Sequence, residues 1–142
     1  MKKVVLFYFI VIVPCLAKRF ISIKLDNVNV RKGPSLEYPI NFTYVIKNMP
    51  LEFIAEYGDF YKVKDKDGDE GWVSASLTSK KRYLIVKNNT QIIYKNDNVD
   101  APLLFRVEEN VVLEYIKCNK DWCKVKVNGK KGWIESVNVY GA

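Results

Sequence analysis

The residues best suited to covalent chemistry are Cys118 and Cys123, which are separated by Asn119-Lys120-Asp121-Trp122. This spacer has the composition of a hairpin turn, which places the two cysteines at facing strand ends, within the range that a disulfide requires. A metal or redox pair is the alternative. A zinc site needs four ligands, however, and the chain has neither a second pair of cysteines nor any histidine. The sequence therefore predicts a Cys118–Cys123 disulfide if the protein is exported, and no metal or cofactor.

The absence of histidine also limits catalysis. Histidine is the commonest general base, so Ser–His and Cys–His nucleophilic systems are excluded. Aspartates and glutamates are present, but no pair of them stands in a recognisable hydrolase setting. The acidic run 65–70 lacks the full loop and the terminal bidentate glutamate of an EF-hand, so we expect a solvated turn and no calcium site. We expect no catalytic residues and no enzyme activity.

Two tryptophans occur in matching contexts, Gly71-Trp72-Val73 and Gly132-Trp133-Ile134. Our first expectation is that both pack in a core or close a barrel, because large aromatic side chains dominate small cores. The alternative is a partly exposed aromatic platform for a sugar or a peptide. The sequence leaves both interpretations open.

The composition indicates which elements hold these residues. Tyrosine, phenylalanine, tryptophan, valine and isoleucine are abundant and alanine is scarce, which favours strands over helices. The formal net charge is +7, and the lysines are scattered among acidic residues. This pattern indicates a solvated, mildly basic surface, with attraction to anionic cell-wall or membrane polymers as the alternative. We expect an all-β protein.

The N-terminus has the order of a secretory signal peptide. Lys2-Lys3 is followed by the apolar run Val4–Val13 and by Ala17, a small residue suited to cleavage. Ten apolar residues rise only about 15 Å as a helix, too short for a stable membrane span. Lipidation of Cys15 is an alternative that the preceding Pro14 disfavours. A buried N-terminal strand is another. We expect cleavage near Ala17 and a periplasmic or otherwise exported protein.

The remaining chain contains an internal repeat at an offset of about sixty residues. Its three matched blocks pair Asn48–Glu52 with Asn110–Glu114, Phe60–Val63 with Trp122–Val125, and Gly71–Val73 with Gly132–Ile134. The offset is 62 in the first two blocks and 61 in the third, so one copy has lost a turn residue. Three blocks in the same order indicate a duplication.

The first copy resembles a known family. Asn27–Ser35 (Asn-Val-Asn-Val-Arg-Lys-Gly-Pro-Ser) closely resembles the opening of bacterial Src-homology-3 domains, Met49–Glu56 looks like their central strand, and Asp65–Val73 looks like their closing hairpin. Leu77–Arg82 resembles the linker of periplasmic tandem members from α-proteobacteria. The second copy is similar mainly in its C-terminal half and lacks the Asn-Val-Arg opening, so we expect the first copy to be the better binder.

The resemblance implies two small Src-homology-3-like β-barrels in tandem, and these follow the signal peptide that the N-terminal residues indicate. We expect the signal peptide at 1–17, the first domain at 18–79 and the second at 80–142. In such domains a ligand groove lies beside the arm loop that begins at Gly33-Pro34. The aromatic residues in that neighbourhood are Tyr38, Tyr44, Tyr57, Phe60 and Trp72. The binding residues that we predict are Tyr38, Tyr57, Phe60 and Trp72.

The resemblance further implies a non-enzymatic, exported binding module. Its expected partner is peptidoglycan or another cell-wall polymer, or an envelope protein or peptide. An accessory enzyme component acting on peptidoglycan is one alternative, and a structural or adaptor protein without polymer affinity is another. We expect no nucleic-acid partner, because an exported protein does not meet nucleic acid. The sequence does not name the ligand or the oligomeric state.

Overall fold

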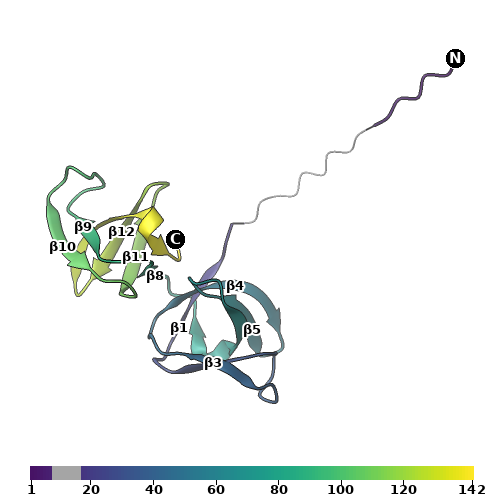
Figure 1. Ribbon diagram of the computed structural model, residues 1–142, viewed down its shortest axis with the longest axis horizontal. Helices are drawn as coiled ribbons and strands as arrows, with labels where there is room; N and C mark the ends of the chain where they lie inside the picture. The colour runs from purple at the N-terminus through teal and green to yellow at the C-terminus, as the bar shows by residue number, and fades with distance from the viewer. Residues whose placement is uncertain (8–16) are drawn as a thin grey trace.

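The computed structural model describes residues 1–7 and 17–142, which form two β-sheets in tandem (Figure 1). The prediction of an all-β protein with two Src-homology-3-like domains is confirmed. Most of the predicted apolar signal segment, together with Cys15, lies outside the described residues, so the signal peptide stays a prediction. No helix in the described part of the chain is long and apolar enough to cross a bilayer.

The first sheet contains seven antiparallel strands and one short 3₁₀ turn. The paired order is β3-β2-β6-β5-β4-β1-β7, and within the described chain hydrogen bonding does not close into a ring. Its elements are β1 (Phe20–Ile23), β2 (Val28–Arg31), β3 (Ile40–Tyr44), β4 (Pro50–Tyr57), β5 (Phe60–Lys64), β6 (Glu70–Ser74), η1 (Ala75–Leu77) and β7 (Thr78–Ser79).

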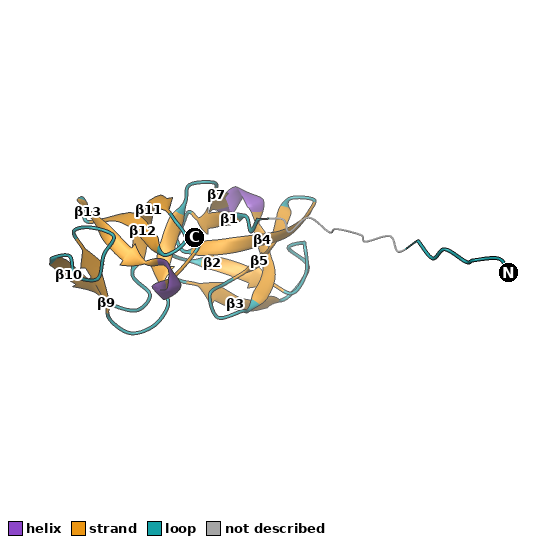
Figure 2. Cartoon of the chain, turned by 90° about the horizontal axis from the view of Figure 1, so that it is seen from above, coloured by secondary structure: helices purple, strands orange, loops and turns teal. Residues whose placement is uncertain are grey.

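The second sheet repeats this order as β10-β9-β13-β12-β11-β8-β14. The two 3₁₀ turns, purple in Figure 2, precede the last strand of each sheet. The elements are β8 (Tyr83–Val86), β9 (Gln91–Tyr94), β10 (Leu103–Val107), β11 (Val112–Cys118), β12 (Trp122–Val127), β13 (Lys130–Glu135), η2 (Ser136–Asn138) and β14 (Val139–Tyr140). The duplication seen in the sequence is therefore a duplication of the whole topology.

Turn residues explain why the two copies fold alike. Asn48 and Asn110 both have φ of 66°, the left-handed conformation that asparagine tolerates better than most residues. Asn128 and Gly129 also have positive φ, which a tight hairpin between β12 and β13 demands. Equivalent turns therefore begin equivalent strands in both copies.

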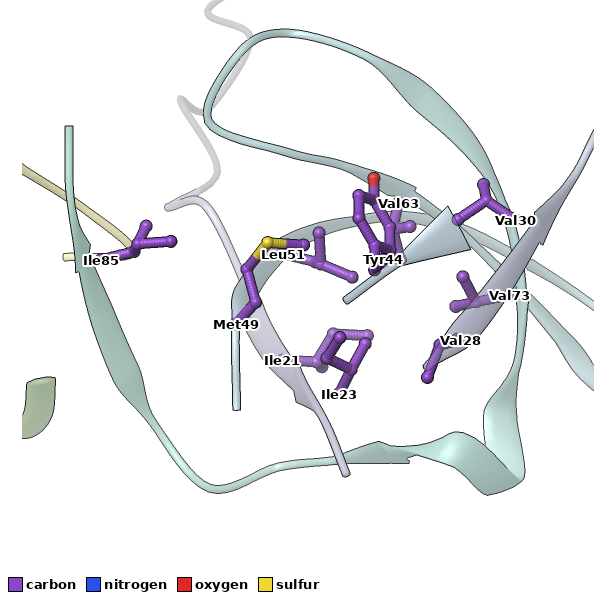
Figure 3. Packing of buried hydrophobic residues seen from close by; sticks show 10 residues of the cluster. All are labelled: Ile21, Ile23, Val28, Val30, Tyr44, Met49, Leu51, Val63, Val73 and Ile85. Atoms are coloured by element: carbon purple, nitrogen blue, oxygen red, sulfur yellow. The ribbon is translucent and has the colours of Figure 1, made fainter. Parts of the chain in front are cut away.

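Each sheet curls around its own aliphatic core (Figure 3 shows the first). The alternation of inward and outward residues along each strand supplies these side chains. The first core contains Ile21, Ile23, Val28, Val30, Tyr44, Met49, Leu51, Val63 and Val73, and the second contains Leu84, Val86, Ile93, Val107, Leu113, Cys123, Val125, Ile134 and Val139.

The two sheets also contact each other. Ile85 of β8 is fully buried and packs into the core of the first sheet (Figure 3). The Tyr140 ring meets Phe20 edge to face at 5.3 Å, and its hydroxyl donates a hydrogen bond of 2.7 Å to the Lys64 carbonyl. The Arg82 guanidinium lies over the rings of both Phe20 and Tyr115. These contacts bury residues of both sheets at their junction.

Candidate functional site

Trp72 lies on the outside of the first sheet. Its neighbours Gly71 and Val73 are buried, and strand alternation therefore directs Trp72 outward, where it is half-buried. A Cβ at Gly71 would come within 2.3 Å of the Val30 side chain, so only glycine fits this inner position. Of the two packing roles that we expected for Trp72, a place in the core is wrong, because the adjacent inward position belongs to the glycine.

Charged residues surround Trp72. In the β-sheet register Trp72 lies opposite Arg31 of β2 and Lys62 of β5. Lys62 forms an ion pair of 3.6 Å with Glu70. A shallow pocket opens here, and we call its lining the first outer face: Arg31, Lys32, Asn41, Lys62, Glu70, Gly71 and Trp72. This face offers an aromatic ring among charges of both signs.

Tyr38 belongs to the arm loop beside this face. Its ring packs on Gly33, where a Cβ would approach the ring to 2.3 Å. The Arg31 guanidinium donates hydrogen bonds to the carbonyls of Tyr38 (2.9 Å) and Leu36 (3.2 Å). Arg31 thus ties the arm loop to the strand that carries the first outer face. Tyr38 is 47% exposed.

Tyr57 and Phe60 lie together at the end of the β4–β5 hairpin, where they are cross-strand partners. Tyr57 is strongly exposed and Phe60 is half-buried. Neither residue lines the pocket at Trp72, and neither does Tyr38. Strand register nevertheless places Tyr57, Phe60 and Trp72 on one face of the sheet, because Phe60 and Trp72 are diagonal neighbours across β5 and β6. Tyr38 lies apart from them, in the arm loop. The role of these four residues in binding stays a prediction.

Tyr44 has a structural role and does not face a groove. It is buried, and its hydroxyl donates a hydrogen bond of 3.0 Å to the Asp65 carboxylate. That carboxylate also accepts from the backbone N–H of Asp67 (2.9 Å) and of Asp69 (3.1 Å). Burial and the neighbouring carboxylate raise the pKa of Tyr44 well above its ordinary value. The acidic hairpin is therefore not fully solvated, because Asp65 is buried and organises it.

The second sheet carries a corresponding outward aromatic cluster. Trp133 of β13 lies opposite Tyr94 of β9 and Lys124 of β12. The Tyr94 and Trp122 rings meet edge to face, with centroids 5.6 Å apart. Sequence reasoning missed Tyr94, because the second copy lacks the opening that identifies β2. The internal repeat is the signal that could have identified Tyr94, because Tyr94 pairs with Trp133 as Arg31 pairs with Trp72.

The predicted disulfide is present in the structure. Cys118 and Cys123 are cross-strand partners on β11 and β12, with Cα atoms 4.0 Å apart and sulfurs 2.06 Å apart. The Asn119 side chain accepts hydrogen bonds from the backbone N–H of Asp121 and Trp122, which fixes the intervening turn. Cys118 and Cys123 therefore form a structural disulfide, and neither has a free thiol.

A curled seven-stranded sheet with an outward tryptophan, repeated in tandem, defines a pair of SH3-like domains. Residues 24–80 and 87–141 each match the bacterial SH3 domain family, and the chain belongs to that family. No curated protein matches the sequence.

Among solved structures, NlpC2 and NlpC1 from Trichomonas vaginalis are similar, each with 12% sequence identity and a TM-score of 0.40. The matches cover 87% and 89% of this chain and 48% and 47% of those chains, respectively. An NlpC/P60 family protein from Bacillus cereus has 13% identity and a TM-score of 0.39, over 85% of this chain and 55% of its own. The chain thus spans about half the length of these proteins.

Proposed function

We propose that this chain is a non-enzymatic, exported module that binds peptidoglycan through the outside of its SH3-like sheets. The observation that supports this most is the outward tryptophan in both copies, Trp72 and Trp133. Each core is filled by other residues, so neither indole is needed to complete it. An aromatic ring held on a rigid sheet suits contact with a sugar or peptide at small entropic cost.

The lack of histidine and the disulfide between Cys118 and Cys123 support the non-enzymatic part of the proposal. Without a histidine base or a free thiol at these positions, the usual nucleophilic systems of cell-wall hydrolysis have no counterpart here.

Export is supported by the disulfide, which is typical of oxidising compartments, and by the order of residues at the N-terminus. The mass of the protein from its native envelope should lack residues 1–17. A mass that retains them contradicts cleavage at Ala17, and an added diacylglycerol favours lipidation of Cys15.

The test of binding is sedimentation with purified peptidoglycan sacculi. The protein should pellet with the sacculi, and the supernatant should contain no released muropeptides. Trp72→Ala should reduce the pelleted fraction, whereas Val45→Ala, at an exposed position outside the first outer face, should not. A Tyr38→Ala and Tyr57→Ala double variant tests the arm loop and the hairpin end together.

Each part of the proposal has a result that opposes it. If the parent protein stays in the supernatant, polymer binding is wrong and an adaptor role for an envelope protein becomes the leading interpretation. If muropeptides are released, the protein is an enzyme. If Trp72→Ala and Val45→Ala pellet as well as the parent, the first outer face is not the contact.

A further inference from the structure

The outside of the second sheet gathers three aromatic rings. Tyr94, Trp122 and Trp133 come from three adjacent strands, β9, β12 and β13, and all three are half-buried. Their inward neighbours Ile93, Cys123 and Ile134 fill the core, so strand alternation points the rings outward. The core is filled without the two tryptophans and the tyrosine, which together form an outward-facing surface. We call Tyr94, Trp122, Trp133, Lys117 and Lys124 the second outer face.

Lysines are held against these rings. The Lys117 ammonium lies 5.6 Å from the centre of the Trp133 ring, and the Lys124 ammonium lies 5.9 Å from it. Among the described residues neither lysine is ion-paired with a carboxylate. Attraction to the indole positions both ammonium groups without neutralising their charge. Glu135, the cross-strand partner of Trp122, is a carboxylate on the same side of the sheet, and within the described chain it is not ion-paired with either lysine. Two lysines against one carboxylate leave a net positive charge beside the rings, which favours an anionic ligand.

The first outer face differs from the second in its aromatic rings and in its charges. Strand register places Arg31 where the second sheet has Tyr94, Phe60 where it has Trp122, and Ala55 where it has Lys117. Lys62, the counterpart of Lys124, is ion-paired with Glu70. At the position of Glu70 the second sheet has Lys131, which lies opposite Lys126. Glu135, the cross-strand partner of Trp122, stands where the first sheet has Ser74 and adds one negative charge to the second sheet. Over matched positions, Arg31, Lys32, Lys62 and Glu70 give the first sheet a formal charge of +2, and Lys95, Lys117, Lys124, Lys131 and Glu135 give the second +3. The second outer face is therefore richer in aromatic surface and lies in a slightly more positive setting.

The arm loop is also kept in the second copy, although the sequence there is different. Backbone hydrogen bonds join Lys95 to Pro102 at 2.9 Å and Lys32 to Pro39 at 3.1 Å, at corresponding positions of the two loops. A loop of the same form therefore stands beside Tyr94, as it stands beside Arg31. The loss of the Asn-Val-Arg opening does not remove the setting for a ligand.

We propose that the second outer face binds a glycan that carries carboxylate groups at regular intervals. Sugar rings would stack on Trp133, Trp122 and Tyr94, and carboxylates would pair with Lys117 and Lys124. Charge complementarity selects the anionic glycan over a neutral one, and the three rings select a glycan over a polyanion without sugar rings. The proposal rests on the proposed function and extends it, because it places a ligand site on the second domain, whereas we expected from the sequence that the first copy is the better binder.

The experiment measures binding of the mature protein to polygalacturonic acid by affinity electrophoresis, with dextran and poly-glutamate as comparison polymers. The parent should be retarded by polygalacturonic acid, less by poly-glutamate and least by dextran, and added salt should weaken the retardation. Trp133→Ala and Lys117→Glu should each weaken binding by about tenfold or more. Tyr83→Ala and Lys47→Glu remove an aromatic ring and reverse a charge away from the face, and should change binding by less than about twofold.

Three outcomes overturn the proposal: no retardation by polygalacturonic acid, equal effects of Lys117→Glu and Lys47→Glu, or retardation by poly-glutamate as strong as by the glycan. Lys117 is exposed, so its substitution tests the site even if Trp133→Ala unfolds the protein. Sacculus sedimentation separates this proposal from the proposed function. Sedimentation with sacculi but no retardation defeats only the second outer face. Retardation without sedimentation defeats peptidoglycan binding and leaves the glycan site standing.

Discussion

Substitution of Tyr44 by phenylalanine tests how the first domain fixes its closing hairpin. The Tyr44 hydroxyl is buried and donates to the Asp65 carboxylate at 3.0 Å, while two backbone N–H groups donate to the same carboxylate. A hydrogen bond to a charged acceptor contributes about 1.5–3 kcal/mol. In the variant the two N–H groups still bond Oδ1 of Asp65, whereas Oδ2 loses the Tyr44 donor. We expect Tyr44→Phe to lower the free energy of unfolding by about 2 kcal/mol. Asp65→Ala should cost more, because it leaves three donors without an acceptor.

The assay is equilibrium unfolding in urea, followed by circular dichroism. The matched control is Tyr61→Phe, since Tyr61 packs on the same core and its hydroxyl makes no hydrogen bond within the described residues. We expect the control to change stability by less than about 0.5 kcal/mol. Equal losses for Tyr44→Phe and Tyr61→Phe would refute the reasoning, because the loss would then not come from the bond to Asp65. An unchanged midpoint for Tyr44→Phe would refute it as well.

Three further predictions concern stability. Reduction of the Cys118–Cys123 disulfide should lower the free energy of unfolding by about 2 kcal/mol, and thiol counting on denatured, unreduced mature protein should find no free cysteine. Trp72→Ala should destabilise the protein less than Leu51→Ala, because Leu51 is fully buried and its truncation costs about 2–5 kcal/mol. The folded state raises the pKa of Tyr44 and Tyr140, mainly by burial, so their contribution is complete below about pH 10 and is lost as the pH rises further; urea midpoints should fall above that pH.

The contact between the two sheets was not predictable from the repeat. Ile85 of β8 and Tyr140 of β14 are cross-strand partners, and the corresponding pair in the first sheet is Ser22 and Ser79. The second copy thus has a large apolar residue and an aromatic one where the first copy has two serines. Both larger residues pack on the first sheet, where Ile85 joins its core. A strand pattern predicts which face is apolar but does not indicate what covers it.

The outer faces also combine features that the sequence indicated with features that it did not indicate. The repeat, the turn residues and the spacing of Cys118 and Cys123 indicated the topology and the disulfide, because these depend on local backbone preferences and on residues near in sequence. The side on which Trp72 and Trp133 lie was not indicated. The side of each tryptophan depends on whether the glycine or the tryptophan takes the inner position of the strand. The sequence left both arrangements open, because each side of the strand carries an apolar residue.

The sequence by itself determined that the chain is all-β, that it contains a duplication and that a disulfide joins Cys118 to Cys123. Those properties follow from alternating apolar residues, from turn residues that tolerate positive φ, and from a five-residue separation between cysteines. Only the tertiary structure decided that Tyr94, Trp122 and Trp133 share a surface with Lys117 and Lys124. These residues come from four strands, and their proximity is set by strand order and register, which are fixed only when both cores close.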